Sequence, residues 1–161
     1  MLKNQIDAID IRIMSELTRD AEIPFIRLAK MLKVSNTLIH QRVRKLKEKG
    51  ILTKARFQID PYIVGYQTTA YIQIRLDNSA YHKKVESKLV EIPEIIECVN
   101  ISGPYAILVK VIARNNRHLR DIIYENILEI EGVQGTNSTF SFETAFSRGV
   151  PLHEILNNEE S

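Results

Sequence analysis

The chain has 161 residues, 44% of them hydrophobic, which suits one domain of ordinary size or two small ones. It has no run of about 18 apolar residues, so no membrane span is predicted, and its opening residues lack the apolar core of a signal peptide, so we expect a cytoplasmic protein. The single cysteine, Cys98, excludes an internal disulfide and a multi-cysteine metal site.

The net charge of +2 is unevenly distributed along the chain. Residues 1–60 carry 13 Lys and Arg against 7 Asp and Glu, a net charge of +6. Residues 61–161 carry 9 and 13, a net charge of −4. A basic half beside an acidic remainder favours a module that binds a polyanion, although a solvated basic surface would leave the same charge pattern.

The basic half shows the spacing of three helices. Asp7 can cap the first, which should end near residues 19–20 and bury residues four apart, namely Ile9, Ile13 and Leu17. Pro24 suits the first turn of a second helix. Ser35 is a strong N-cap for a third, over residues 35–49, and Gly50 stands where a left-handed C-cap belongs. Alternating apolar and polar residues over 51–59 predict a short hairpin or wing.

The third helix carries the functional signal. One face, Ile39, Val43 and Leu46, should be buried, and the opposite face offers hydrogen-bonding and cationic groups. In a helix-turn-helix the N-terminal part of this helix reaches the bases, which predicts base contacts from Asn36, Thr37, His40, Gln41 and Arg44. The N-terminus at Ser35 favours a phosphate, and the remaining phosphate contacts are expected from Lys45, Lys47, Lys49, Lys54 and Arg56. For Arg42 an ion pair with Asp7 or Asp10 and a DNA contact both stay open.

Residues 67–146 alternate between strand-like and helix-like patterns. Strands are predicted over 68–76, 95–101, 106–112 and 133–144. One helix should begin at Asn78 or Ser79 and stop at Pro93, and a second should begin at Asn115 or Asn116 and bury Leu119, Ile123 and Ile127. The order β-α-β-β-α-β is ferredoxin-like, so we predict an α+β protein whose sheet has both helices on one face. The uncovered face then favours pairing with another chain.

A turn-prone linker over residues 61–66 separates the two domains, and residues 147–161 form a C-terminal tail. Within that tail, residues 152–156 are long enough for one helical turn, and disorder is expected at 159–161.

Several short motifs follow one another along the chain: Ile6-Asp7 with Asp10 and Ile13, Ser35-x-Thr37-x-Ile39-x-x-Arg42-Val43, Gly50-Ile51, Ile59-Asp60-Pro61, Pro93-Glu94-Ile95, Ser102-Gly103-Pro104-Tyr105 and Glu131-Gly132-Val133. In this order they resemble the Lrp/AsnC (feast/famine) family of transcriptional regulators over about residues 5–145. The resemblance implies a winged helix-turn-helix that binds double-stranded DNA, joined to a ferredoxin-like domain that assembles dimers into tetramers or octamers.

The resemblance also implies an amino acid or related small molecule bound between dimers, at positions held here by Gly103, Tyr105, Ala106, Thr136 and Ser138. Two residues depart from the family pattern. Ala106 stands where the family usually has an acidic residue, and alanine cannot accept hydrogen bonds from an α-amino group. Leu38 replaces a polar residue or proline, and it either contacts a thymine methyl or packs against the wing.

Other classes of function have less support. A low-specificity architectural DNA binder uses the same basic helix, so that alternative stays open. An enzyme built on the ferredoxin-like half would need a nucleophile or an acid–base pair, and the sequence shows neither pattern. We therefore predict a regulator with no catalytic residues, no metal site and no cofactor, whose partners are double-stranded DNA, copies of itself and a small-molecule effector, but no membrane.

Overall fold

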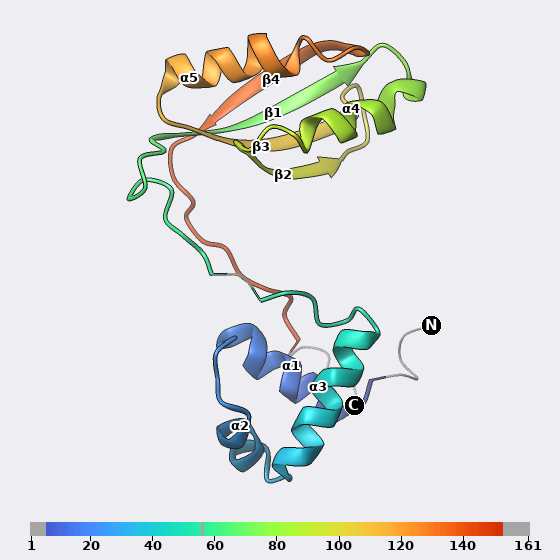
Figure 1. Cartoon of the computed structure of the whole chain (residues 1–161), viewed down its shortest axis with the longest axis vertical. Helices are drawn as coiled ribbons and strands as arrows, with labels where there is room; N and C mark the ends of the chain where they lie inside the picture. The colour runs from blue at the N-terminus through green and yellow to red at the C-terminus, as the bar shows by residue number, and fades with distance from the viewer. Residues whose placement is uncertain (1–5, 56, 153–161) are drawn as a thin grey trace. The chain divides into compact units, whose positions relative to one another are not determined.

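The structure, a computed structural model, describes residues 6–55 and 57–152. It divides into two compact units, which are described separately (Figure 1). The first unit contains the described residues up to Phe57 together with the segment that begins at Phe146. The second unit is Gln58–Ala145.

The first unit consists of three helices, α1 (Ala8–Arg19), α2 (Phe25–Leu32) and α3 (Asn36–Glu48). The start of α1 is fixed by a reciprocal capping box: the Asp10 amide donates to Asp7 Oδ1 at 2.9 Å, and the Asp7 amide donates to Asp10 Oδ2 at 3.2 Å. Pro24 stands directly before α2, and the Ser35 hydroxyl caps α3 by accepting from the Leu38 amide at 3.1 Å. All three helix starts agree closely with the sequence prediction.

Two helices of this unit end in the same hydrogen-bond pattern. At the end of α2 the Val34 amide donates to the Ala29 carbonyl at 3.0 Å, and at the end of α3 the Ile51 amide donates to the Leu46 carbonyl at 2.9 Å. The residue before each donor is left-handed, Gly50 with φ 68° as predicted and Lys33 with φ 55°. A side chain in that conformation is strained, so Lys33 marks a tight turn between α2 and α3.

The core of the first unit lies between the three helices. Ile13, Leu28 and Ile39 are fully buried, and the predicted inner face of α3 is completed by Val43 and Leu46. The partly buried Leu152 from the end of the described chain also packs against this core. The sequence predicts that residues 147–161 form a tail outside both domains. In the structure the described part of that tail belongs to the first unit, whereas the helical turn and the disorder expected beyond it fall largely outside the described residues.

The predicted hairpin over residues 51–59 is not formed, since the described residues of that segment contain no strand. Ile51 and Leu52 are consecutive, yet both pack against the helical core. In a strand their side chains would point to opposite faces, so this packing excludes a regular pleat there. Two short strands without a third partner are also marginally stable, so the core contacts prevail over the alternating pattern.

The second unit is a four-stranded antiparallel sheet with strand order β2-β3-β1-β4, as expected for the ferredoxin-like arrangement. Along the chain its elements are β1 (Thr68–Leu76), η1 (Ser79–Tyr81), α4 (His82–Leu89), β2 (Ile95–Asn100), β3 (Ile107–Ala113), α5 (Asn116–Asp121), the π-helical segment η2 (Ile122–Ile127) and β4 (Val133–Ser141).

β2 and β3 lie within one residue of their predicted limits, and three other elements of the second unit differ more from the prediction. The helix before Pro93 begins as the 3₁₀ turn η1 and ends at Leu89. The second helix widens into η2, where the Leu128 amide donates to the Ile123 carbonyl five residues earlier. This wider turn buries Ile122 and Ile127, which are five apart, and leaves Ile123 only partly buried. The last strand ends at Ser141, three residues before the predicted Thr144.

Both helices of the second unit cover the same face of the sheet. Val85 and Leu89 of α4 and Leu119 of α5 share one core with alternate residues of the two central strands. Those strand residues are Ala70, Ile72 and Ile74 of β1 and Ile107, Val109, Val111 and Ala113 of β3. The residues between them lie on the other face, where Lys110 Nζ lies 5.6 Å from the centre of the Tyr71 ring. Neither of the two helices described in this unit covers that second face, which agrees with the prediction.

Candidate nucleic-acid interface

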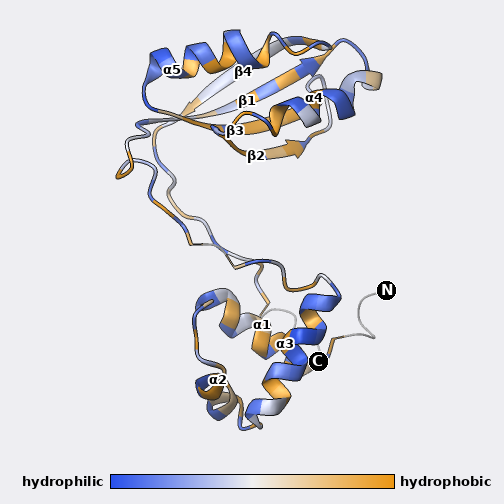
Figure 2. Cartoon of the chain, in the orientation of Figure 1, coloured by the Kyte–Doolittle hydropathy of each residue, from blue (hydrophilic) through white to orange (hydrophobic). Residues whose placement is uncertain are grey.

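The exposed face of α3 gathers most of the predicted DNA-binding residues. Ile39, Val43 and Leu46 point into the core, and seven of the predicted DNA-binding residues on this helix are exposed: Asn36, Thr37, His40, Gln41, Arg44, Lys45 and Lys47. Hydrophilic residues accordingly predominate along α3 in Figure 2. Ser35 and Lys54 are also exposed, whereas Arg56 lies outside the described residues. One helix therefore presents amides, an imidazole and cations together on a solvent-accessible face.

The start of α3 leaves donors available to an anion. The Ser35 hydroxyl satisfies the Leu38 amide. The amides of Asn36 and Thr37 precede it in the first turn, where a helix supplies no carbonyl partner. Amides in this position, together with the helix dipole, favour a phosphate oxygen.

His40 is oriented by a contact with α2. Its ring meets the Phe25 ring edge-to-face, with centroids 4.8 Å apart and planes at 72°. Because Phe25 begins α2 and also packs against the core, this contact restrains an imidazole that otherwise points to solvent. Leu38 is partly buried, and it is not among the residues that pack against the helical core.

Arg42 forms the ion pair that the sequence left open. Its Nη1 lies 2.5 Å from Asp7 Oδ2 and 3.2 Å from Asp10 Oδ2, and Asp10 is only 3% exposed. Burial alone would raise the pKa of Asp7, but hydrogen bonds from the Asp10 amide and the Arg42 guanidinium outweigh it, so the pKa is lowered. The hydrogen bond to Asp7 in turn raises the pKa of Arg42. Arg42 therefore fastens α3 to the start of α1 and belongs to the scaffold.

Arg44 differs from Arg42 although it stands only two residues away. Its Nε lies 3.8 Å from Glu48 Oε1, and its side chain is 75% exposed. An ion pair this open is worth less than about 1 kcal/mol, so a base edge or a phosphate can displace Glu48 easily. The structure therefore leaves the Arg44 guanidinium exposed and only weakly paired.

Two cations on α2, Arg27 and Lys30, add to this surface although they are not among the predicted DNA-binding residues. Arg27 and Lys30 are exposed and three residues apart, so they lie on one side of α2. The first helix of a helix-turn-helix crosses the DNA backbone, which makes these side chains candidates for phosphate contacts. The signal in the sequence is the three-residue spacing of Arg27 and Lys30, which places two cations on one side of a predicted helix.

The residues proposed for an effector lie at one end of the second unit's sheet. The Ala106 amide donates to the Ile74 carbonyl at 3.0 Å, and Thr136 pairs with Ile74 from the other side. Ser138 pairs with the neighbouring Ile72, and Gly103 adopts φ 111° in the turn before β3. The Ala106 carbonyl accepts from the Ile101 amide, so both backbone groups of Ala106 are used and it offers only a methyl group.

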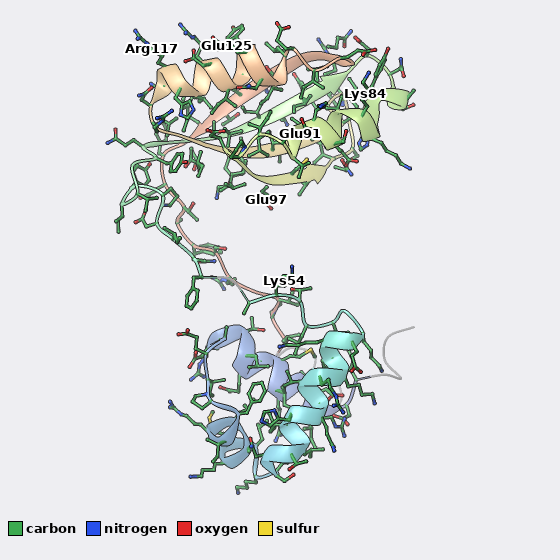
Figure 3. All side chains as sticks on the ribbon, in the orientation of Figure 1. Lys54, Lys84, Glu91, Glu97, Arg117 and Glu125 are labelled. Atoms are coloured by element: carbon green, nitrogen blue, oxygen red, sulfur yellow. The ribbon has the colours of Figure 1, made fainter. Side chains whose placement is uncertain are left out.

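The surface of the second unit carries charges of both signs. Figure 3 shows its labelled side chains, Lys84, Glu91, Glu97, Arg117 and Glu125, pointing away from the sheet and helices. Lys84 pairs with Glu131, and Lys88 pairs with Glu91. This mixed surface contrasts with the cationic face of α3 and is typical of a solvated exterior.

Comparison with known proteins identifies both units. Residues 6–53 match the model of a winged helix-turn-helix DNA-binding domain, and residues 69–151 match that of the Lrp/AsnC ligand binding domain. The HTH-type transcriptional regulator FL11 of Pyrococcus furiosus is 31% identical over 85% of this chain and 89% of its own length. The regulatory protein AsnC of Haemophilus influenzae is also 31% identical, over 91% of this chain and 98% of its own.

Solved structures agree with these matches. The structure of AsnC from E. coli superposes with a TM-score of 0.83 and 30% identity, covering 90% of this chain and 97% of that one. A transcriptional regulator of Neisseria meningitidis in complex with L-Met shares the fold, with a TM-score of 0.87 at 18% identity over 94% of this chain and 99% of that one. With two family domains in the expected order, this chain belongs to the Lrp/AsnC family of transcriptional regulators.

Proposed function

We propose that this regulator reads a specific double-stranded DNA site as a homo-oligomer, with the exposed face of α3 in the major groove. The observation that carries the proposal is the division of α3 into a buried apolar face and an exposed face of amides and cations. The base contacts are assigned to Asn36, Thr37, His40, Gln41 and Arg44. Contacts to phosphates are assigned to the amides at the start of α3 and to Arg27, Lys30, Lys45, Lys47, Lys54 and Arg56.

One copy of α3 presents too few base-reading side chains for a long site, so a second copy is required. The uncovered face of the sheet supports self-association, because three large apolar or aromatic side chains, Tyr71, Leu108 and Val99, lie on it between polar residues. A symmetric dimer would present two recognition helices to half-sites about 34–36 Å apart, one turn of DNA. Dimers of this kind assemble further into tetramers or octamers.

An electrophoretic shift assay tests this function. The wild-type protein should retard a fragment of its own upstream region at a concentration at which random DNA of equal length stays free. Arg44→Ala should weaken that preference, because each lost bidentate contact to a base removes about 1–3 kcal/mol of discrimination. The control is Arg12→Ala, which removes an exposed cation from α1 instead. Equal retardation of specific and random DNA by the wild type would contradict sequence-specific regulation and favour an architectural DNA binder.

We further propose that an amino acid or a related small molecule binds at the sheet end formed by Gly103, Tyr105, Ala106, Thr136 and Ser138. The family relationship and the L-Met complex of the Neisseria regulator support this assignment. The methyl group of Ala106 supplies no acceptor for an ammonium group, so binding should be weaker than in a site with a carboxylate there.

Thermal unfolding in the presence of each of the twenty amino acids tests the effector site, since a ligand that binds only the native state raises the melting temperature. Ala106→Asp restores a carboxylate and should enlarge the shift. No response from either the wild type or the variant would exclude amino-acid sensing at this sheet end.

The remaining assignments concern location and organisation. None of the helices that the structure describes is long and apolar enough to cross a membrane. We propose that the protein acts in the cytoplasm and that it regulates by binding, with no catalytic step. We assign residues 1–60 to DNA binding, 61–66 to a linker and 67–146 to effector binding and oligomerisation.

A further inference from the structure

The chain runs between the two units twice. It leaves the first unit after Phe57, builds the whole second unit, and re-enters the first unit at Phe146. The described end of the chain thus belongs with the DNA-binding helices, although it follows β4 of the ferredoxin-like sheet. The residues that hold this end in place are Gly149 to Leu152, here called the C-terminal anchor.

Gly149 lies in close contact with α1. A Cβ added at this position would lie 2.5 Å from Thr18 Cγ2, which is far below a normal contact distance. Thr18 is itself held in place, because its hydroxyl donates to the Met14 carbonyl at 2.7 Å and thereby fixes where the methyl group points. In this arrangement of residue 149 against α1, only glycine therefore fits beside Thr18.

The next three residues direct the chain into the core. The Leu152 amide donates to the Val150 carbonyl at 2.9 Å, which closes a three-residue γ-turn around Pro151. Proline fixes a negative φ, so this turn is preset in the unfolded chain. The turn delivers the Leu152 side chain to the core of the three helices, where it is partly buried. Before the anchor, Arg148 lies over the Phe146 ring at 4.4 Å.

We propose that the C-terminal anchor is a second tether, which fastens the end of β4 to α1 and so restricts how far the DNA-binding unit can reorient. If the chain after Phe57 were the only connection between the two units, the DNA-binding unit could reorient as freely as one flexible linker allows. A second attachment removes much of that freedom and holds the two recognition helices of a dimer at a defined spacing. The anchor begins eight residues after the end of β4 at Ser141, and β4 is the strand that carries Thr136 and Ser138, so a ligand bound beside β4 has a second chain connection to α1, apart from the linker.

The contact between Thr18 and Gly149 allows a compensation test in the full chain. Gly149→Ala introduces the clash, whereas Thr18→Ser removes the methyl group but keeps the hydroxyl that bonds to Met14. In Thr18→Ser/Gly149→Ala the nearest remaining side-chain atom is Thr18 Cβ at 4.0 Å, an ordinary contact. If the anchor docks as described, the first variant releases it and the double variant restores it. Leu152→Ala provides an independent release.

Limited trypsin digestion measures the release of the anchor from the first unit. The peptide bond after Arg148 adjoins the anchor, so its rate of cleavage follows the fraction of molecules in which the anchor is undocked. We expect cleavage there to be about tenfold faster in Gly149→Ala and in Leu152→Ala, and to return to the wild-type rate in the double variant. Cleavage after Lys110, within β3, should be the same in all four proteins. Wild-type rates in Gly149→Ala, or no rescue by Thr18→Ser, would overturn the proposal. So would protection that disappears on dilution, because the anchor would then belong to a neighbouring copy.

The effect on DNA rests on the proposed function and is measured separately. Affinities are compared for two half-sites at the preferred spacing and for the same half-sites moved by half a turn of DNA, about 5 base pairs. The ratio should fall at least about threefold in Gly149→Ala and recover in the double variant. An unchanged ratio in a protein whose anchor is released would overturn the tether role. If no DNA is bound by any of the proteins, the trypsin result still decides whether the anchor docks.

Discussion

Replacing Arg42 by methionine should destabilise the first unit strongly without touching the proposed DNA-reading face. Arg42 and Arg44 are two residues apart and carry the same charge, but Arg42 pairs with the buried Asp10 and Arg44 pairs with the exposed Glu48. Methionine keeps most of the apolar stem of the side chain and removes the guanidinium. The change therefore isolates the ion pair from the packing.

The magnitude follows from the burial of Asp10. Its side chain is 4% exposed, and its carboxylate accepts from the Asp7 amide and from Arg42 Nη1. Removing one partner of a fully buried ion pair costs about 3–5 kcal/mol. Because the Arg42 side chain is 26% exposed, water can replace part of the lost interaction, and we expect about 2–3 kcal/mol. For a unit of this size that corresponds to a fall in melting temperature of about 10–20 °C.

Far-UV circular dichroism at 222 nm follows the melting, and hydrogen exchange of the α1 amides locates it in the first unit. Arg44→Met is the matched control and should change the melting temperature by no more than about 2–4 °C. Equal melting of the two variants would refute the reasoning. So would an Arg42→Met protein that is as stable as the wild type but no longer binds DNA, since Arg42 would then be a DNA contact.

The same network predicts how stability depends on pH. The pKa of Asp7 is lowered in the folded state from its ordinary value of 3.8, so the folded state binds this proton less readily than the unfolded state. The stabilisation is therefore complete above about pH 4 and is lost as the pH falls through the folded pKa. Arg42→Met removes one cause of the shift, so the acid-dependent loss of stability should be smaller in that variant. An identical loss in both proteins would contradict the role of the ion pair.

Three further predictions concern single positions. Lys33→Gly should raise the free energy of unfolding by up to about 1 kcal/mol, because Lys33 is left-handed, and an unchanged denaturant midpoint would contradict this. Gly132→Ala should destabilise the second unit by more than about 3 kcal/mol, because the new Cβ would lie 2.2 Å from Tyr81 Cγ at φ 96°; a wild-type melting curve would rule this out. Lys30→Ala should weaken binding to all DNA sequences equally and lower the slope of log affinity against log salt by about 1, whereas a change in sequence preference would speak for a base contact.

Features that depend on nearby residues were predictable from the sequence. The cap at Asp7, the cap at Ser35 and the left-handed Gly50 all form where the local pattern placed them. The strand β1 also has the predicted limits, because its alternation is uninterrupted from Thr68 to Leu76. The two faces of α3 were separated correctly for the same reason, since a 3.6-residue period alone determines which side chains share a face.

Features that depend on distant residues were not predictable in the same way. The role of Arg42 depends on Asp7, 35 residues earlier, so the sequence left two alternatives. The hairpin expected after α3 competes with a helical core against which both Ile51 and Leu52 pack. The position of Gly149 depends on Thr18, at the other end of the chain. No periodicity or spacing encodes contacts of this kind.

In-vitro selection from random double-stranded DNA tests the central claim most directly. The full-length protein should enrich a motif of two inverted half-sites whose centres lie about one helical turn apart. Selection with Arg44→Ala should lose the preference at one base position in each half-site while the phosphate-dependent affinity remains. Failure of the wild type to enrich any motif, or enrichment of the same motif by Arg44→Ala, would contradict the assignment of α3 as the helix that reads DNA.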